Sequence, residues 1–269
     1  MWNDQSFKRR RPVARLISAA ATAVTTFALC TSPAQAQLKV LMSGGFSGAY
    51  RQVLPEFEKS TGITVRTGSG ASQGTGAQTI AAQLQRGVPA DVVILSREGL
   101  EELSAAGRIV AGSEVDLARV PLGVAVRAGT ATPDVSSVEA FKRTLLNARS
   151  VVVPGSTSGI YLTSKIFPQL GIAERISVKV TERGAQSAAM VAAGDANIAV
   201  QPVSELVNVP GITFSGRLPN ELQLVQIFAA AIVTGAKEPD AGRRLIQFLA
   251  SDRAAAAIEN SGMDLIDKR

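Results

Sequence analysis

Three short loops of the sequence combine glycine with serine or threonine just ahead of a predicted helix. They lie at residues 43–48, 69–76 and 154–159. Such loops place backbone N–H groups and hydroxyls at the positive end of a helix dipole, an arrangement that binds anions. Serine and threonine are also ordinary helix caps, and capping alone explains any one of these loops; three such loops in one chain leave the anion-binding role and the capping role equally open. The candidate contacts are Ser43, Gly45, Phe46, Ser72, Thr75, Thr157, Ser158 and Gly159.

These loops do not match the phosphate-binding loops of nucleotide enzymes. The segment 69–76 lacks the Lys followed by Ser or Thr that a P-loop requires. The segment 44–48 lacks the G-x-G-x-x-G spacing of dinucleotide-binding proteins. We therefore expect a small anion rather than a nucleotide, and no cofactor.

Several charged residues have two possible roles. Arg97 and Arg183 are candidates for clamping a carboxylate, because a guanidinium donates two parallel hydrogen bonds to it. Each also fits a helix end, with its charge in water. Asp91 follows Pro89 and Ala90, and a single Asp ahead of a buried strand is more often a loop cap than a metal ligand. We expect no metal site.

An enzyme would need an acid–base group poised near neutral pH, and the sequence offers few. Glu205 follows Gln201 closely enough to reach the same cleft, so it is a weak catalytic candidate. Glu205 also fits the first turn of a helix, where acidic residues are stabilising. The other candidates are Glu182, Tyr50, Tyr161 and, more remotely, Lys165.

Histidine is absent from all 269 residues, and the one cysteine is Cys30. The absence of histidine excludes the Ser-His-Asp triad, the Cys-His dyad and His-ligated zinc. A single cysteine excludes a disulfide within the chain. Any chemistry must therefore come from carboxylates, hydroxyls, amides, arginines and the backbone.

The first 36 residues have the parts of a cleaved secretory signal peptide. A cationic stretch at 8–11 precedes a weakly apolar run at 16–29, and Ala34-Gln35-Ala36 fits a small-x-small cleavage site. The run is short and rich in Ala and Thr, which favours cleavage over a membrane anchor. We expect a soluble periplasmic protein that begins at Gln37.

The leader also accounts for most of the net charge. The chain carries +6, and residues 1–36 hold five basic residues and one acidic residue. The remaining chain is close to neutral, so it lacks the basic field that nucleic-acid binding needs. We expect no nucleic-acid partner.

Apolar strand-like runs alternate with amphipathic helical stretches through the mature chain, a pattern typical of an α/β fold with mainly parallel sheets. Ligands of such folds lie at the carboxyl ends of the strands. The expected strands are 38–42, 63–67, 92–95, 122–126, 150–153, 178–180, 198–200 and 228–233. The expected helices lie at about residues 50–61, 80–87, 97–106, 138–147, 160–170, 185–193 and 240–250.

Three segments resemble the periplasmic molybdate-binding-like solute receptors, namely LKVLMSGG at 38–45, GVPADVVILS at 87–96 and SGIY at 158–161. The likeness extends over nearly all of residues 38–265. It implies a type II periplasmic binding fold, with two α/β lobes that each hold a mainly parallel sheet flanked by helices. Two implied crossover segments, near 119–124 and 222–228, assign residues 37–120 and 226–269 to lobe 1 and residues 121–225 to lobe 2.

The resemblance also implies ligand contacts, with departures from the family. Gly45 stands where the family has an oxyanion-binding Ser, and Gln201 stands near the place of its ligand-contacting Tyr. Ser158 and Gly159 match best, and Gly184 with Ala185 is implied to supply a backbone N–H. The loss of two donors disfavours molybdate, because each missing hydrogen bond to a buried oxyanion costs about 1–3 kcal/mol. Gln201, Gln186 and Arg183 suit a larger carboxylate-bearing solute.

Two functions follow from these observations. The favoured interpretation is a monomeric periplasmic solute-binding protein that traps a small anion between its lobes and delivers it to an inner-membrane ABC transporter. The alternative is an enzyme, because the resemblance includes a branch with a periplasmic aconitate isomerase. Such an enzyme would interconvert trans- and cis-aconitate by a proton shift.

Overall fold

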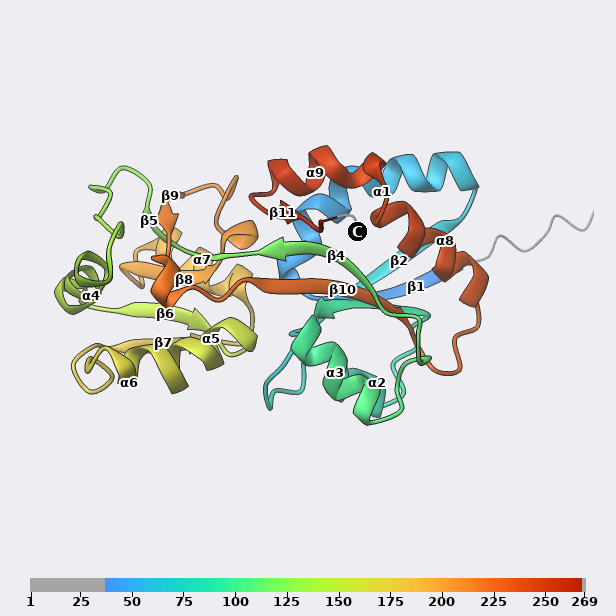
Figure 1. Cartoon of the computed structure of the whole chain (residues 1–269), viewed down its shortest axis with the longest axis horizontal. Helices are drawn as coiled ribbons and strands as arrows, with labels where there is room; N and C mark the ends of the chain where they lie inside the picture. Colours follow the sequence, from blue (N-terminus) through green and yellow to red (C-terminus); the bar gives the residue numbers. More distant parts are fainter. Residues whose placement is uncertain (1–36, 268–269) are drawn as a thin grey trace, which may run out of the picture. The chain divides into compact units, whose positions relative to one another are not determined.

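Strands and helices alternate from Gln37 onward, in two sheets (Figure 1). The computed structural model describes residues 37–267. The expected signal peptide, residues 1–36, lies outside the described residues. The described residues pack as one compact unit, within which each sheet has its own hydrophobic core on both faces.

Sheet 1 has six strands in the order β11-β4-β10-β3-β1-β2. β1 pairs in parallel with β2 and β3, whereas β10 lies antiparallel between β3 and β4. β1 to β4 therefore share one direction, and their carboxyl ends lie at one edge of the sheet. The strands are β1 (Gln37–Met42), β2 (Thr64–Ser69), β3 (Val92–Ser96), β4 (Val115–Val120), β10 (Gln226–Ile232) and β11 (Asp264–Leu265).

Helices cover both faces of sheet 1 because its central strands are apolar on both sides; every residue of β3 is buried. One face packs against α1 (Ser47–Thr61), α8 (Pro239–Leu249), η5 (Asp252–Ala254) and α9 (Ala255–Asn260). The other face packs against α2 (Ile80–Gln85) and α3 (Arg97–Ala105). The short 3-10 turn η1 (Gly44–Phe46) leads directly into α1.

Sheet 2 has five strands in the order β7-β6-β8-β5-β9, and β5 alone runs against the others. Its strands are β5 (Leu122–Arg127), β6 (Val151–Pro154), β7 (Val178–Thr181), β8 (Ile198–Pro202) and β9 (Ile212–Arg217). Its helical elements are α4 (Val138–Asn147), α5 (Thr157–Tyr161), the π-helical turn Leu162–Ile166, α6 (Phe167–Gln169), α7 (Gly184–Ala193), η3 (Val203–Glu205) and η4 (Asn220–Leu222).

Three strands were not expected from the sequence. β4 and β9 are only partly buried and β11 is exposed, and all three contain charged residues, so they lack the continuous apolar run that marks the central strands. Their positions depend on pairing with strands that are distant in sequence, which periodicity alone does not reveal.

The chain crosses between the sheets twice. Pro121 joins β4 to β5, and residues 223–225 lead from η4 into β10, close to the predicted crossovers. The side chain of Gln223 ties the two crossings together: its Oε1 accepts from the N–H of Leu122 at 2.6 Å and its Nε2 donates to the Leu122 carbonyl at 3.1 Å. Sheet membership follows the predicted lobes, whose boundaries stay a prediction.

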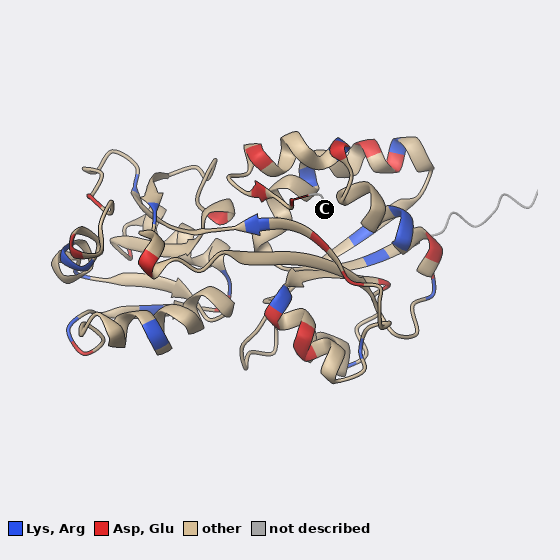
Figure 2. Cartoon of the chain, in the orientation of Figure 1, with Lys and Arg blue, Asp and Glu red and all other residues tan. Residues whose placement is uncertain are grey.

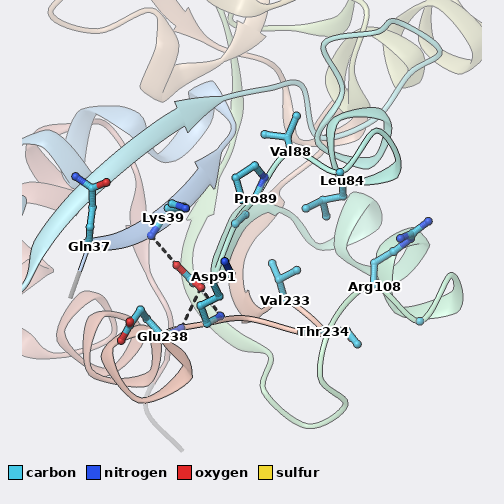
Figure 3. A pocket seen from close by; sticks show the side chains of 15 residues that line it. Gln37, Lys39, Leu84, Val88, Pro89, Asp91, Arg108, Val233, Thr234 and Glu238 are labelled. Carbon is cyan, nitrogen blue, oxygen red and sulfur yellow. Dashed lines mark hydrogen bonds between the residues drawn. The ribbon is translucent and has the colours of Figure 1, made fainter. Parts of the chain in front are cut away.

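Asp91 is a structural clamp at the opposite end of sheet 1 from the helix-entry loops (Figure 3). Its side chain is 3% exposed. It accepts hydrogen bonds from the backbone N–H groups of Lys39, Lys237 and Glu238 at 2.8, 2.7 and 3.1 Å. The carboxylate thereby joins β1, the start of β3 and the entry to α8, which is the cap role that the sequence allowed.

We expect Asp91→Ala to lower the free energy of unfolding by about 3 kcal/mol, because three backbone donors lose a charged acceptor. Asp91→Asn, which keeps one acceptor oxygen, should cost less. Urea denaturation measures both changes. The control is Asp195→Ala, at an exposed position, which should stay within about 0.5 kcal/mol of the unmodified protein. An equal effect of the two alanine variants would contradict the clamp.

Candidate functional site

The loops that follow the carboxyl ends of the strands meet in a small cavity between the two sheets. Ser43 follows β1 and Ser72 follows β2, whereas Ser158, Gly184 and Glu205 follow β6, β7 and β8. This is where open α/β sheets bind their ligands. The cavity has a volume of about 30 Å³, room for about one water molecule. A larger ligand therefore requires the surrounding loops to move apart.

Direct contacts join the two sides around this cavity. The hydroxyls of Ser96 and Thr157 are 2.9 Å apart. The Ser156 hydroxyl accepts from the N–H of Gln73 at 3.3 Å, and the Arg183 guanidinium donates to the Ser69 hydroxyl. Each pair joins a residue at the carboxyl edge of sheet 1 to a residue at the facing edge of sheet 2, so the structure shows the two sides in their closed arrangement.

Glu205 occupies the centre of the site. It ends η3, directly after β8, and its carboxylate lies against the backbones of Gly44 and Gly184. A Cβ atom at either glycine would collide with the carboxylate oxygens. Glycine at both positions is thus a steric requirement of this arrangement. Glu205 also lines two outer pockets of about 430 and 450 Å³, so its side chain separates the inner cavity from the outside.

The surroundings of Glu205 alter its acidity. Burial among protein atoms raises the pKa of its carboxyl to about 7, and the nearby positive charge of Arg183 limits that rise. Desolvation disfavours the charged form of an acid, whereas an opposite charge favours it. The result is a carboxyl that gains and loses a proton near neutral pH, which is the property of an efficient general base.

Four buried polar atoms beside Glu205 lack a hydrogen-bond partner among the described residues: Gln201 Oε1, Gln226 Oε1, Arg183 Nε and Ser204 Oγ. Gln201 is fully buried, and its Nε2 donates to the Glu205 carbonyl at 3.0 Å. Gln226 is 2% exposed and lines the cavity. An unpaired buried polar atom costs about 1–3 kcal/mol, so these atoms are natural partners for a polar ligand.

The structure brings many of the predicted residues together. Ser43, Gly45, Ser72, Ser158, Gly184 and Glu205 all line the cavity. Ala185 lines the two outer pockets beside Glu205. Two others act indirectly, because Thr157 bonds Ser96 across the closed cleft and Gln201 holds the backbone of Glu205.

Other predicted ligand contacts lie elsewhere. Phe46 is fully buried in the core of sheet 1, because the turn η1 directs its ring inward. Thr75 is exposed at the tip of its loop. Gly159 packs against the Pro154 carbonyl, where any Cβ would collide, so this glycine serves the entry to α5.

The remaining acid–base and arginine candidates are also placed by the fold. Glu182, Lys165 and Gln186 are exposed, and Arg97 pairs with Asp116. The Tyr161 hydroxyl lies 3.3 Å from the Leu222 carbonyl. Tyr50 lines one outer pocket and bonds Thr67 at 2.9 Å, and burial raises the pKa of its hydroxyl to about 12, too high for a base at neutral pH.

Gln226 and Phe228 also belong to the cavity wall and were not predicted from the sequence. Both lie on β10 and, two positions apart, face the same side of the strand. A signal was present, because Gln226 is a polar residue at the head of an otherwise apolar run, QIFAAAI. The significance of this polar residue became clear only from the position of β10 in sheet 1, next to the helix-entry loops.

The charges of the described residues are of both signs and interspersed over the helices of both sheets (Figure 2). Within residues 37–267, no group of three or more His, Cys, Asp or Glu side chains is arranged to hold a metal ion. None of the helices in the same range combines the length and apolarity needed to span a bilayer. The charged side chains that line the cavity are those of Glu205 and Arg183. The backbone N–H groups of the helix-entry loops add their dipoles.

Two sheets linked by two crossings, with a polar cavity between their carboxyl edges, define a two-lobe solute-binding fold of the type II periplasmic class. Solved structures of that class match at low sequence identity. The periplasmic molybdate-binding protein of Azotobacter vinelandii matches with a TM-score of 0.68 and 20% identity, over 86% of this chain and all of that one. The sulfate-binding protein SubI of Mycobacterium tuberculosis matches with a TM-score of 0.66 and 18% identity, over 86% and 88%.

Residues 38–264 match the family model of the bacterial extracellular solute-binding proteins, and the chain belongs to this family. A relative at 40% identity is the aconitate isomerase of a Pseudomonas species, aligned over 84% of this chain and 87% of that protein. The expected fold class and the resemblance, including its aconitate isomerase branch, are confirmed.

The raised pKa of Glu205 predicts how stability depends on pH. The folded protein holds the proton up to about pH 7, whereas an unfolded Glu releases it near pH 4.3. Folding is therefore most favoured below the unfolded pKa, and stability is lost as pH rises through 7. Glu205→Gln removes this loss, so it should be more stable than the unmodified protein at pH 8 by on the order of 2 kcal/mol, allowing for partial exposure.

Urea denaturation of both proteins at pH 4 and pH 8 measures this difference. Near pH 4, below the unfolded pKa, the two should differ little, since Glu205 is mostly protonated in both the folded and the unfolded state and resembles Gln. Glu182→Gln, at an exposed position, is the control and should change stability equally at both pH values. A constant difference between Glu205→Gln and the unmodified protein would show that Glu205 is not desolvated.

Proposed function

We propose that this chain binds a small tricarboxylate in the cleft and that Glu205 shifts a proton within it, so that trans- and cis-aconitate interconvert. The observation that carries this proposal is the Glu205 carboxyl, held between Gly44 and Gly184 with a pKa of about 7. The 40% identity to an aconitate isomerase supports the same reaction. A receptor that only binds an anion does not need a group that gains and loses a proton near neutral pH.

The reaction needs one base and no redox partner. The carboxylate of Glu205 takes a proton from the methylene carbon that lies between the double bond and a carboxylate. The electron pair moves into the allylic system as the double bond shifts, and the carbanion is delocalised onto the carboxylate oxygens. Protonated Glu205 then returns the proton to the former vinyl carbon. All atoms of the substrate are retained, and Glu205 ends the cycle as it began.

The rest of the cavity suits the charge that develops. Preorganised donors aimed at a developing negative charge are a large source of catalysis. Arg183 lies beside Glu205, and the Ser43, Ser72 and Ser158 loops supply hydroxyls and backbone N–H groups. Closure around a substrate excludes water, which strengthens each of these interactions. The Arg183 Nε–H, a buried donor without a partner among the described residues, can donate to a carboxylate oxygen of the ligand.

The second candidate is a receptor that traps an anion without turnover and passes it to an ABC transporter, and membership in the solute-binding family favours it. Export through the 1–36 leader, cleavage after Ala36, a periplasmic location and a monomeric state belong to both proposals. The two differ in one respect: only the enzyme depends on the proton of Glu205.

We expect the purified mature protein to convert trans-aconitate into cis-aconitate. Chromatographic separation of the two isomers measures the rate of this conversion. The rate should rise with pH through about 7, because the base must be deprotonated. Glu205→Gln should lower kcat by about 10²–10⁴-fold, the usual contribution of general acid–base catalysis. Thermal stabilisation by trans-aconitate should persist in this variant.

Glu182→Gln is the matched control, because Glu182 is exposed, and its rate should be unchanged. Binding of trans-aconitate without conversion would favour the receptor. Conversion that survives Glu205→Gln would assign the proton transfer to another group.

A further inference from the structure

One wall of the cavity differs from the rest. The helix-entry loops line the cavity with hydroxyls, amide groups and glycine backbone, and with the charged side chains of Arg183 and Glu205. The wall formed by Phe228 is instead an aromatic ring. Phe228 is 2% exposed and belongs to the core of sheet 1. Its backbone is fixed on both sides, since it pairs with Ser96 of β3 and with Ala118 of β4. The ring is therefore a rigid part of the cavity wall.

Gly45 makes room for this ring. A Cβ atom built on Gly45 would lie 2.7 and 2.8 Å from two carbons of the Phe228 ring and closer still to its tip. Any larger residue at 45 would thus displace a ring that two neighbouring strands hold in place. The glycine and the phenylalanine are sterically coupled: the absence of a side chain at 45 allows an aromatic ring at the cavity.

An aromatic ring in the cavity wall imposes a condition on the ligand. A tetrahedral inorganic oxyanion carries oxygens on every side, and the ring has no donor for the oxygen that faces it. A flat hydrocarbon backbone with carboxylates at its rim fits differently, because its plane stacks on the ring while the carboxylates reach the polar wall.

We propose that the Gly45–Phe228 pair sets the ligand specificity of the cleft by selecting a flat, unsaturated organic carboxylate. This inference rests on the proposed function and adds to it the residue that recognises the planar carbon skeleton. Glu205 transfers the proton, and Phe228 recognises the planar shape of the substrate.

The test compares two ligands that carry the same three carboxylates. Aconitate contains a planar carbon–carbon double bond, and tricarballylate is its saturated, non-planar analogue. Both aconitate isomers are unsaturated, so turnover does not disturb the comparison. Isothermal titration calorimetry gives the ratio of the two dissociation constants for the unmodified protein, which we expect to favour aconitate, and for Phe228→Leu. Leucine keeps the apolar bulk but loses the flat face, and the ratio should fall about tenfold.

Phe248→Leu is the matched control, since Phe248 packs in the same core, against Phe57 at 5.5 Å between ring centroids, away from the cavity. Its ratio should be unchanged. Gly45→Ala should lower the ratio as Phe228→Leu does, because the new methyl group displaces the ring.

An unchanged ratio in Phe228→Leu would overturn the inference while leaving the proposed function intact. An equal fall in Phe248→Leu would also overturn it, by tracing the effect to core packing. Failure of the unmodified protein to bind either tricarboxylate would instead overturn the proposed function, and the inference with it. Equal affinity of the unmodified protein for the two ligands would contradict the inference alone.

Discussion

The site depends on one steric constraint: a carboxylate lies between two polypeptide backbones that approach each other closely. Gly44 belongs to the loop after β1 and Gly184 to the loop after β7, and neither has space for a Cβ atom beside Glu205. This closeness removes water from the carboxylate, which raises its pKa to about 7. Acidity, geometry and access to the cavity are therefore consequences of the same packing.

Such a site carries an energetic cost in the closed protein. A desolvated carboxylate and the unpaired atoms of Gln201, Gln226 and Arg183 all oppose closure. Apart from Phe228, which belongs to both, the cores on both faces of each sheet and the structural clamp at Asp91 do not line the cavity, so they stabilise the fold without depending on the ligand. Stability and function are in this way assigned to opposite ends of the strands, as is common in α/β proteins.

The scaffold by itself does not decide between a receptor and an enzyme, because one fold supports many functions. The same arrangement of helix-entry loops serves to hold an anion in either case. The residues of this cleft with chemistry to offer are a proton-carrying carboxyl at 205, an arginine at 183 and, on β10, an aromatic ring at 228. The proposed reaction of an unsaturated carboxylate rests on these residues.

Local sequence determined the central strands, most helices and the loops of the cavity, because hydrophobic periodicity and capping residues act over a few neighbours. It therefore predicted Ser43, Ser72 and Ser158 at the site and Asp91 as a cap, but placed Phe46 and Thr75 there as well. Only tertiary structure decided that Phe46 faces a core and Thr75 faces solvent. Tertiary structure also decided the role of Glu205 and the position of Phe228 in the cavity wall. Glu205 lies against Gly44 and Phe228 against Gly45, each more than 100 residues away in the chain.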